Sequence, residues 1–490
     1  FVRSEFVGGK TNKDVYNLNL YHTFNKNNKS VIGLKHSDVT FRNNTWQINK
    51  NRDTLNKIEF DKGFKNIDIS RILMNHENEQ IELSGILKDS TYKDIHLNFK
   101  DVDLAKITPE IDSLSLQGNV NGKLDISQKN GTILPNSSIT IDDLDVNNTY
   151  LGSFSANIKG DESLTRYDVD IKIKDEVTPT LSAQGVIDVG DETSFVDVFV
   201  DFDNFNLEPL NPFGGEVISN IRGLATGEVH VNGNLKRPNM DGELLLNQAG
   251  MLIPYLNVDL SMAPNSSVKL EQQSFVLGNI NITDTAYNTK GKLKGRINHK
   301  NFSNWDLDLA LSTDKLLVLN TEDSEDALYY GTGFIKGDAT ISGPAEQLVI
   351  AVNATTMPGT DFKIPLNDTE SFGDNTFIKF LSPEEKLATQ QGIDLDTKQI
   401  SGLELDFDLD ITQDAQIELV LDKASGSTIK GKGVGALLID INTNGKFNIY
   451  GDFSVFEGEY NFLYGGIIQK QFRVKPGSSL SWDGDPLGAR

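Results

Sequence analysis

The sequence of 490 residues contains no cysteine, which excludes a disulfide framework and any metal site built on thiolates. It also has no apolar run long enough to span a bilayer, so we predict neither a transmembrane helix nor a signal peptide within it. Because the chain begins with Phe1 rather than Met, we expect it to be an internal or C-terminal piece of a longer protein, with any membrane anchor lying outside it.

Positive charge is also scarce, with 46 Lys and Arg against 70 Asp and Glu and a net charge of -24. So acidic a surface repels phosphate backbones and anionic membrane surfaces, which argues against nucleic-acid binding and against lying flat on a bilayer. Apolar residues make up only 38% of the chain, yet Phe occurs 26 times. A low apolar fraction that includes many large side chains indicates a thin structure with one apolar face.

Strand patterns dominate what is present. In residues 403–411, Leu and Phe side chains alternate strictly with Asp and Glu, and similar alternation occurs in residues 169–173, 305–311 and 417–421. A period of two places all apolar side chains on one face of a strand and the charges on the other. The chain is therefore predicted to be all-β, built from strands with one buried and one solvated face.

Helix signals are few. Residues 382–385 read Ser-Pro-Glu-Glu, which supplies an N-cap, a proline at the first helical position and a capping-box glutamate. We predict a short helix near residues 382–390, which either connects two strands or plugs a groove, and the connecting role is favoured.

Glycine pairs separated by three residues recur at intervals of roughly 100 residues. Glycines placed so regularly within strands indicate bends, bulges or close backbone approach. A repeat this long does not fit short solenoids such as ankyrin or leucine-rich repeats and suits modules of many antiparallel strands. The pairs are Gly118 and Gly122, Gly223 and Gly227, Gly333 and Gly337, and Gly431 and Gly435.

These intervals predict five modules: residues 1–100, 101–205, 206–315, 316–404 (with the short helix near 382–390) and 405–490. A long sheet with one apolar face must curl over to cover that face. The predicted fold is thus an elongated, curled antiparallel β-groove, shaped like a folded taco. At about 12 residues for each strand and its turn, the chain holds about 40 strands.

The C-terminal residues 429–490 resemble the C-terminal domain of TamB proteins, a family of AsmA-like, groove-forming proteins. The resemblance lies in an ordered series of glycines and aromatic residues that closes on a Gly-Asp-Pro motif. Residues 330–344 and 359–366 are similar to the Bacteroidetes-like members of the same family. The closing series comprises Gly451, Phe453, Gly458, Tyr460, Phe462, Phe472, Val474, Gly477, Ser478, Leu480, Trp482, Gly484, Asp485 and Pro486.

The resemblance implies a bridge across the periplasm of a Gram-negative bacterium, anchored in the inner membrane by an N-terminal helix and reaching the outer membrane at its C-terminus. It implies a TamA-like outer-membrane β-barrel with POTRA domains as the partner, and a role in outer-membrane protein assembly or phospholipid transfer. The family's C-terminal domain continues for several strands beyond the Asp-Pro motif, so we expect the last domain to be incomplete here.

The alternation and the resemblance together select candidate functional residues. Apolar side chains on the inner face are expected to contact lipid: Leu405, Phe407, Leu409, Ile411, Leu419, Leu421, Phe447, Ile449, Phe453, Val455, Tyr460 and Phe462. The resemblance implies that the closing motif faces the partner: Phe472, Trp482, Asp485 and Pro486. We predict no catalytic residue, no metal and no cofactor.

The sequence contains no complete motif for catalysis or metal binding. The six histidines are scattered without metal-ligand spacing, and Asp406, Asp408 and Asp410 stand about 6.7 Å apart along one strand, too far for compact calcium binding. Residues 426–433 approach a phosphate-binding loop, but Gly433 stands where Ser or Thr is needed and strands flank it. No Gly-x-Ser-x-Gly nucleophile elbow occurs.

Three functions remain open at this stage. The first is a lipid conduit, favoured by the apolar inner face. The second is an assembly chaperone that templates nascent barrel strands on a free sheet edge and does not transport lipid. The third is an extracellular β-solenoid adhesin or polysaccharide lyase, which requires short rungs and carbohydrate-binding clusters that the sequence does not display.

The predicted elongated groove has a measurable consequence in solution. A compact globule of this length has a radius of gyration of about 23 Å. We expect small-angle scattering of the monomeric chain to give a clearly larger value. A radius close to that of the globule would contradict the groove.

Overall fold

The computed structural model describes residues 2–8, 14–41, 43–88, 92–108, 114–129, 132–161, 165–176, 178–189, 193–214, 218–323, 329–345, 347–365, 402–422, 426–442, 446–464 and 468–490. These residues form 31 strands, which confirms the all-β prediction. The sequence predicted about 40 strands in the whole chain, and many of the described strands are long, up to 19 residues in β22 (Ser303–Thr321). The helix predicted near residues 382–390 lies outside the described residues.

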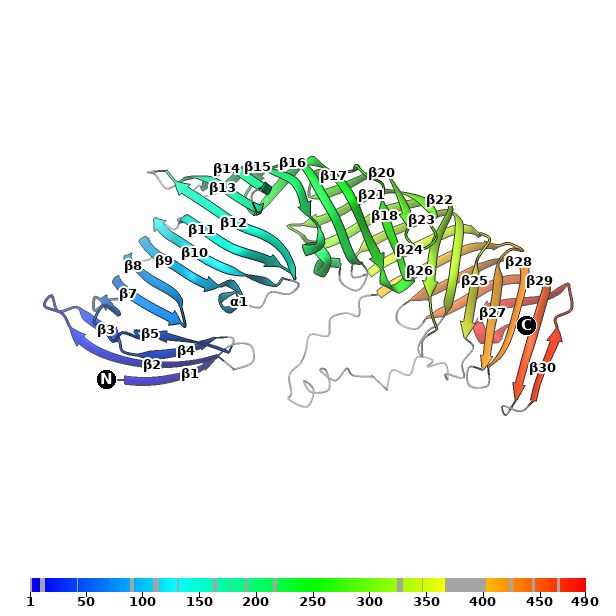
Figure 1. Ribbon diagram of the computed structural model, residues 1–490, viewed down its shortest axis with the longest axis horizontal. Coiled ribbons are helices and arrows are strands. Elements are labelled where there is room, and N and C mark those ends of the chain that lie inside the picture. The colour runs from blue at the N-terminus through cyan, green and yellow to red at the C-terminus, as the bar shows by residue number, and fades with distance from the viewer. Residues whose placement is uncertain are drawn as a thin grey trace. The chain divides into compact units, whose positions relative to one another are not determined.

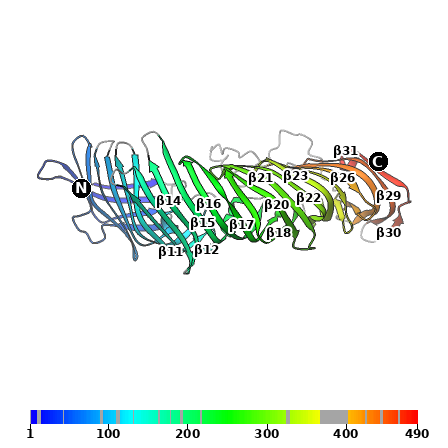
Figure 2. The same cartoon turned by 90° about the horizontal axis from the view of Figure 1, so that it is seen from above.

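The chain divides into two units, of which unit 1 comprises Phe1–Gly215, Ser219–Asn247 and Val268–Gln273. From β7 to β16 each strand pairs antiparallel with the next one in sequence, and Figures 1 and 2 show these strands in one row. The elements are β1 (Val2–Gly8), β2 (Asp14–Phe24), β3 (Ser30–Leu34), β4 (Ser37–Phe41), β5 (Asn44–Ile48), β6 (Lys57–Phe60), β7 (Asn66–His76), β8 (Glu79–Lys88), β9 (Tyr92–Asp103), α1 (Leu104–Ile107), β10 (Leu116–Lys129), β11 (Thr132–Val146), β12 (Thr149–Gly160), β13 (Arg166–Asp175), β14 (Thr178–Val189), β15 (Ser194–Asn206), η1 (Glu208–Gly214) and β16 (Ser219–Asn234).

Unit 2 comprises Glu216–Ile218, Gln248–Ser267 and Ser274–Arg490, so β17 (Arg237–Ile253) and β19 (Ser266–Gln272) contribute to both units. Two of its pairings, β24 with β26 and β25 with β27, are parallel, whereas the sequence predicted only antiparallel strands. The further elements are η2 (Pro254–Leu256), β18 (Val258–Met262), β20 (Ser274–Asp284), β21 (Lys290–Lys300), β23 (Tyr330–Pro344), β24 (Gln347–Thr356), β25 (Asp361–Pro365), β26 (Gly402–Ile411), β27 (Gln416–Asp422), β28 (Ser427–Asn442), β29 (Phe447–Tyr464), β30 (Ile468–Arg473), β31 (Ser478–Gly484) and η3 (Pro486–Gly488).

The sheet of unit 2 is folded along a line that crosses its strands. The long strands β23, β28 and β29 each pair with two short strands that follow one another in sequence: β24 and β25, β26 and β27, and β30 and β31. We call the side with β24, β26 and β31 wall A, and the side with β25, β27 and β30 wall B. Each long strand therefore contributes one half to each wall.

Turns mark the fold line. The short strands are separated by residues 357–360, 412–415 and 474–477. Each break contains a β-turn hydrogen bond, donated by the amides of Thr360, Ala415 and Ser478 to carbonyls three residues earlier. Between the continuous strands β28 and β29, the register shifts at Lys432 and Gly433. A bulge bends a strand without ending it, so the sheet turns the corner with its ladder largely intact.

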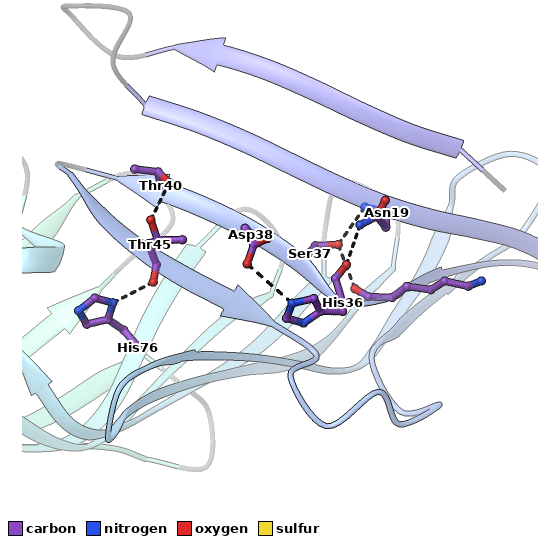
Figure 3. Close-up of polar contacts among 8 residues, drawn as sticks. Asn19, His36, Ser37, Asp38, Thr40, Thr45 and His76 are labelled. Carbon is purple, nitrogen blue, oxygen red and sulfur yellow. Dashed lines mark hydrogen bonds and ion pairs between the residues drawn. The ribbon is translucent and has the colours of Figure 1, made fainter.

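Polar side chains satisfy the backbone groups that such breaks release. Between β3 and β4 of unit 1, Asn19 donates from its side-chain amide to the His36 carbonyl at 2.7 Å, and its backbone amide donates to the hydroxyl of the fully buried Ser37 at 2.9 Å (Figure 3). In unit 2 the amide of Thr412 donates to the hydroxyl of Thr356 at 2.9 Å.

Glycines occupy positions where the backbones of neighbouring strands approach each other closely, as the repeat indicated. Gly122 follows a register shift between β9 and β10, and a Cβ there would lie 2.1 Å from the carbonyl oxygen of Ser138. Gly337 has φ +150° and leaves a Cβ only 2.3 Å from the carbonyl oxygen of Asn353. Neither contact tolerates a side chain without a backbone shift.

Replacement of Gly337 by Ala should therefore destabilise unit 2. The strained backbone and the clash with Asn353 predict a loss of about 1–3 kcal/mol in the free energy of unfolding, measured by urea denaturation. Gly278→Ala is the control, because a Cβ at that position meets nothing within 4 Å, and it should change stability by about 0.5 kcal/mol or less. Equal effects of the two substitutions would show that close approach at Gly337 is unimportant.

The two faces of β28 make a second comparison possible with neighbouring residues of one type. Leu437 is 4% exposed in the core, whereas Leu438 is 53% exposed on the outer face. Leu437→Ala should cost about 2–5 kcal/mol of unfolding free energy because it leaves a cavity. Leu438→Ala should cost about 0.5 kcal/mol or less. A larger loss at Leu438 than at Leu437 would contradict the assignment of the faces.

Candidate functional site

The apolar faces of walls A and B pack against each other in unit 2. Their shared core joins Ile364, Ile417 and Leu419 of wall B to Leu405 and Ile449 of wall A. Between them lies a narrow apolar cavity of about 90 Å³. We call this cavity and the facing surfaces of the two walls the trough.

The predicted lipid-contacting residues of β26 to β29 lie almost entirely on these facing surfaces. Phe407, Leu409 and Ile411 line the cavity itself together with Ile449. Their burial follows the alternation of the sequence, since the intervening Asp408 and Asp410 are exposed. The buried members are Leu405, Ile411, Leu419, Ile449, Phe453 and Val455, and those packed half-buried against them are Phe407, Leu409, Leu421 and Phe447.

Tyr460 and Phe462 lie apart from this core. They are half-buried near the C-terminal end of β29, and Tyr460 stacks on Phe472 of β30 at 5.9 Å between ring centroids. The rings of Tyr460 and Phe462 are 6.0 Å apart. These residues form a small aromatic group on wall B outside the cavity lining. Contact of any predicted residue with lipid stays a prediction.

The four residues assigned to the partner are placed differently. Phe472 is 49% exposed, and Asp485 is also exposed. Trp482, in contrast, is 4% exposed and belongs to the core of the trough, where its indole donates to the carbonyl of Pro486 at 3.2 Å. Trp482 therefore holds β31 against the core, Pro486 is half-buried, and Phe472 and Asp485 have exposed side chains.

The outer face of wall A collects carboxylates. Glu404, Asp406 and Asp440 bring oxygens within 4.8 Å of one another, because β26 and β28 pair Asp406 with Asp440. Lys446 forms an ion pair with Asp440, and this contact, with the nearby charges of Glu404 and Asp406, raises the pKa of the Lys446 ammonium group. The sequence pattern showed Asp406 with its neighbours on one strand only, and the approach of Asp440 depends on strand pairing.

The outer face of wall B carries a row of alternating charge. Strand register places Lys363, Glu418, Lys430, Glu459 and Arg473 side by side on five neighbouring strands. Ion pairs of 3.6 Å join Lys363 to Glu418 and of 3.7 Å join Lys430 to Glu459. Opposite charges on neighbouring strands favour this register and oppose a slipped one.

Histidines hold structural positions. In unit 1 the rings of His36 and His76 contact different partners, Asp38 at 3.9 Å and the carbonyl of Thr45 at 2.8 Å (Figure 3). His299 of unit 2 is 4% exposed among aromatic rings, and its burial lowers its pKa. A buried neutral imidazole of this kind packs as an aromatic side chain.

Sequence reasoning missed the half of the cavity lining that comes before residue 366. Phe334, Ile335, Phe362 and Ile364 line the cavity from β23 and β25, together with Tyr329. The alternation of Phe362 and Ile364 in the short strand β25 was the available signal. Their position opposite β26 depends on the pairing of β24 with β26 and of β25 with β27, which joins strands far apart in the sequence.

One edge of the sheet is open among the described residues. β30 pairs with β29 and with no other described strand. The corresponding edge of β31 is partly covered, since Ser481 and Arg490 exchange two backbone hydrogen bonds of 2.9 and 3.0 Å. An open strand edge offers backbone donors and acceptors to an incoming strand.

Comparison with known families covers nearly the whole chain. A profile of the TamB N-terminal domain matches residues 11–246, and a profile of the TamB C-terminal domain matches residues 278–490. Neither the curated proteins nor the solved structures gave a significant match. None of the helices in the described part of the chain is long and apolar enough to cross a membrane. Because the two profiles together leave only short segments unmatched, the chain belongs to the TamB family.

Proposed function

We propose that the trough of unit 2 carries the acyl chains of phospholipids towards the outer membrane, within the translocation and assembly module in which TamB proteins act. The observation that carries this proposal is the cavity between walls A and B, whose lining is almost wholly apolar. Charged side chains of the same strands, such as Asp408 and Asp410, are exposed away from it.

The energetic reason for such a trough is the cost of moving hydrocarbon through water. About fifteen methylenes at about 0.8 kcal/mol each make a barrier on the order of 12 kcal/mol. An apolar surface that replaces water around the chain removes most of this barrier. The cavity of about 90 Å³ has room for only a few waters, so an entering acyl chain has to part the two walls.

The setting of this activity is also proposed from family membership. The chain would act in the periplasm of a Gram-negative bacterium, in a protein anchored in the inner membrane, with a TamA-like, POTRA-bearing β-barrel as its outer-membrane partner. Phe472 and Asp485 are the exposed members of the four residues predicted to face the partner, so we assign that contact to them first.

The open edge of β30 supports a second candidate function. A strand with one unpaired edge can template a nascent outer-membrane strand by β-augmentation. This chaperone activity requires no lipid in the trough. The two functions are compatible in one molecule, since the edge of β30 and the cavity are separate surfaces.

A photo-crosslinking side chain at two adjacent positions of β26 tests the lipid proposal. At Phe407, which lines the cavity, we expect capture of phospholipid in cells, measured by mass spectrometry of the purified adducts. At Asp408, exposed on the opposite face, we expect several times less.

The two positions are matched controls for expression, fold and proximity to membranes. Equal capture at both positions would contradict the proposed conduit, because lipid contact would then not depend on the face of β26. Capture of outer-membrane proteins, but not lipid, by crosslinkers along β30 would favour the chaperone function.

A further inference from the structure

Tyr329, immediately before β23, lines the cavity and has a ring that contacts both walls. Its ring stacks on Phe362 of β25 with 5.5 Å between centroids and an interplanar angle of 28°. It also lies 6.5 Å from the ring of Phe447, the first residue of β29. Phe362 belongs to wall B and Phe447 to wall A. The ring of Tyr329 therefore fills the contact between the walls.

The hydroxyl of Tyr329 is buried and has no hydrogen-bond partner among the described residues. The other polar side chains of the lining are all partnered: Thr356 and Thr360 bond to neighbouring backbone, and Trp482 bonds to Pro486. The ring of Tyr255 packs edge-on against Tyr329 with 6.3 Å between the ring centroids, and its hydroxyl is close enough to raise the pKa of the Tyr329 phenol. Of the polar side chains that the structure describes in the lining, Tyr329 is the one without a hydrogen-bond partner.

This hydroxyl remains protonated over the physiological range. Burial raises the pKa of the Tyr329 phenol far above its usual value, and the neighbouring Tyr255 hydroxyl raises it further. A neutral phenol in apolar surroundings is a donor that gains from an acceptor on a ligand, since buried polar groups are rarely left unpaired.

The lining also limits the charge of that acceptor. Among the described residues no Lys or Arg lines the cavity, so a carboxylate or phosphate inside it would lose its hydration without gaining a counter-ion from them. A neutral ester carbonyl, which links an acyl chain to its head group, accepts a hydrogen bond and carries no charge. An acyl ester therefore offers an apolar chain with one hydrogen-bond acceptor at its end.

We infer that Tyr329 is a specificity residue of the trough, which donates a hydrogen bond to the ester carbonyl of a bound acyl chain while its ring seals the walls around the hydrocarbon. The inference rests on the proposed function, because it names the part of the lipid that the trough recognises. A trough with this donor would bind acyl esters in preference to plain hydrocarbon.

The test measures preference between two probes in the full chain. Methyl hexadecanoate and nonadecane are offered together from cyclodextrin, and the amounts retained by the purified protein are measured by mass spectrometry. In Tyr329→Phe the ratio of ester to alkane should fall about two- to tenfold relative to the unsubstituted chain. Because Phe keeps the ring contacts, the melting temperature and the retention of alkane should stay unchanged.

Tyr255→Phe is the matched control, since it removes the neighbouring hydroxyl and should leave the ratio unchanged. An unchanged ratio in Tyr329→Phe overturns the role of Tyr329 while the conduit stands. An equal fall in Tyr255→Phe overturns the assignment of the donor to Tyr329. If the unsubstituted chain retains neither probe, the proposed function itself fails, and with it this inference.

Discussion

The packing of one apolar sheet face against another is the interaction on which the rest of unit 2 depends. Each strand has a single apolar face, and neither wall alone can keep that face from water. Folding the sheet along the turns at residues 357–360, 412–415 and 474–477 brings the two faces together. Leu405, Ile441 and Ile449 become almost fully buried as a result, at 1% exposure each.

The same constraint explains the composition. A two-walled sheet has much surface for its volume, so a modest apolar fraction is enough to fill the space between the walls, and the outer faces must be polar. The excess of carboxylates that gives the net charge of -24 lies partly there, on β26 and β28. Where cations join them, as in the row from Lys363 to Arg473, opposite charges fall on neighbouring strands and support the register.

A core that also served as the proposed conduit would have to satisfy opposing demands. Close packing stabilises the folded sheet, whereas an acyl chain needs space between the walls. The trough combines a tight lining around a narrow cavity with the ring of Tyr329 at the contact between the walls.

The sequence by itself determined the all-β class and the face on which each side chain of a strand lies, because a period of two is a local property of the backbone. Residues 403–411 illustrate this, and the closing motif likewise carried the family resemblance without reference to strand pairing. Only the tertiary structure decided which strands face each other. The parallel pairing of β24 with β26, the approach of Asp440 to Asp406, the burial of Trp482 and the position of Tyr329 between the walls all join residues far apart in the chain. Local alternation contains no information about such pairs, since register and partner are selected by the burial and hydrogen bonding of the whole sheet.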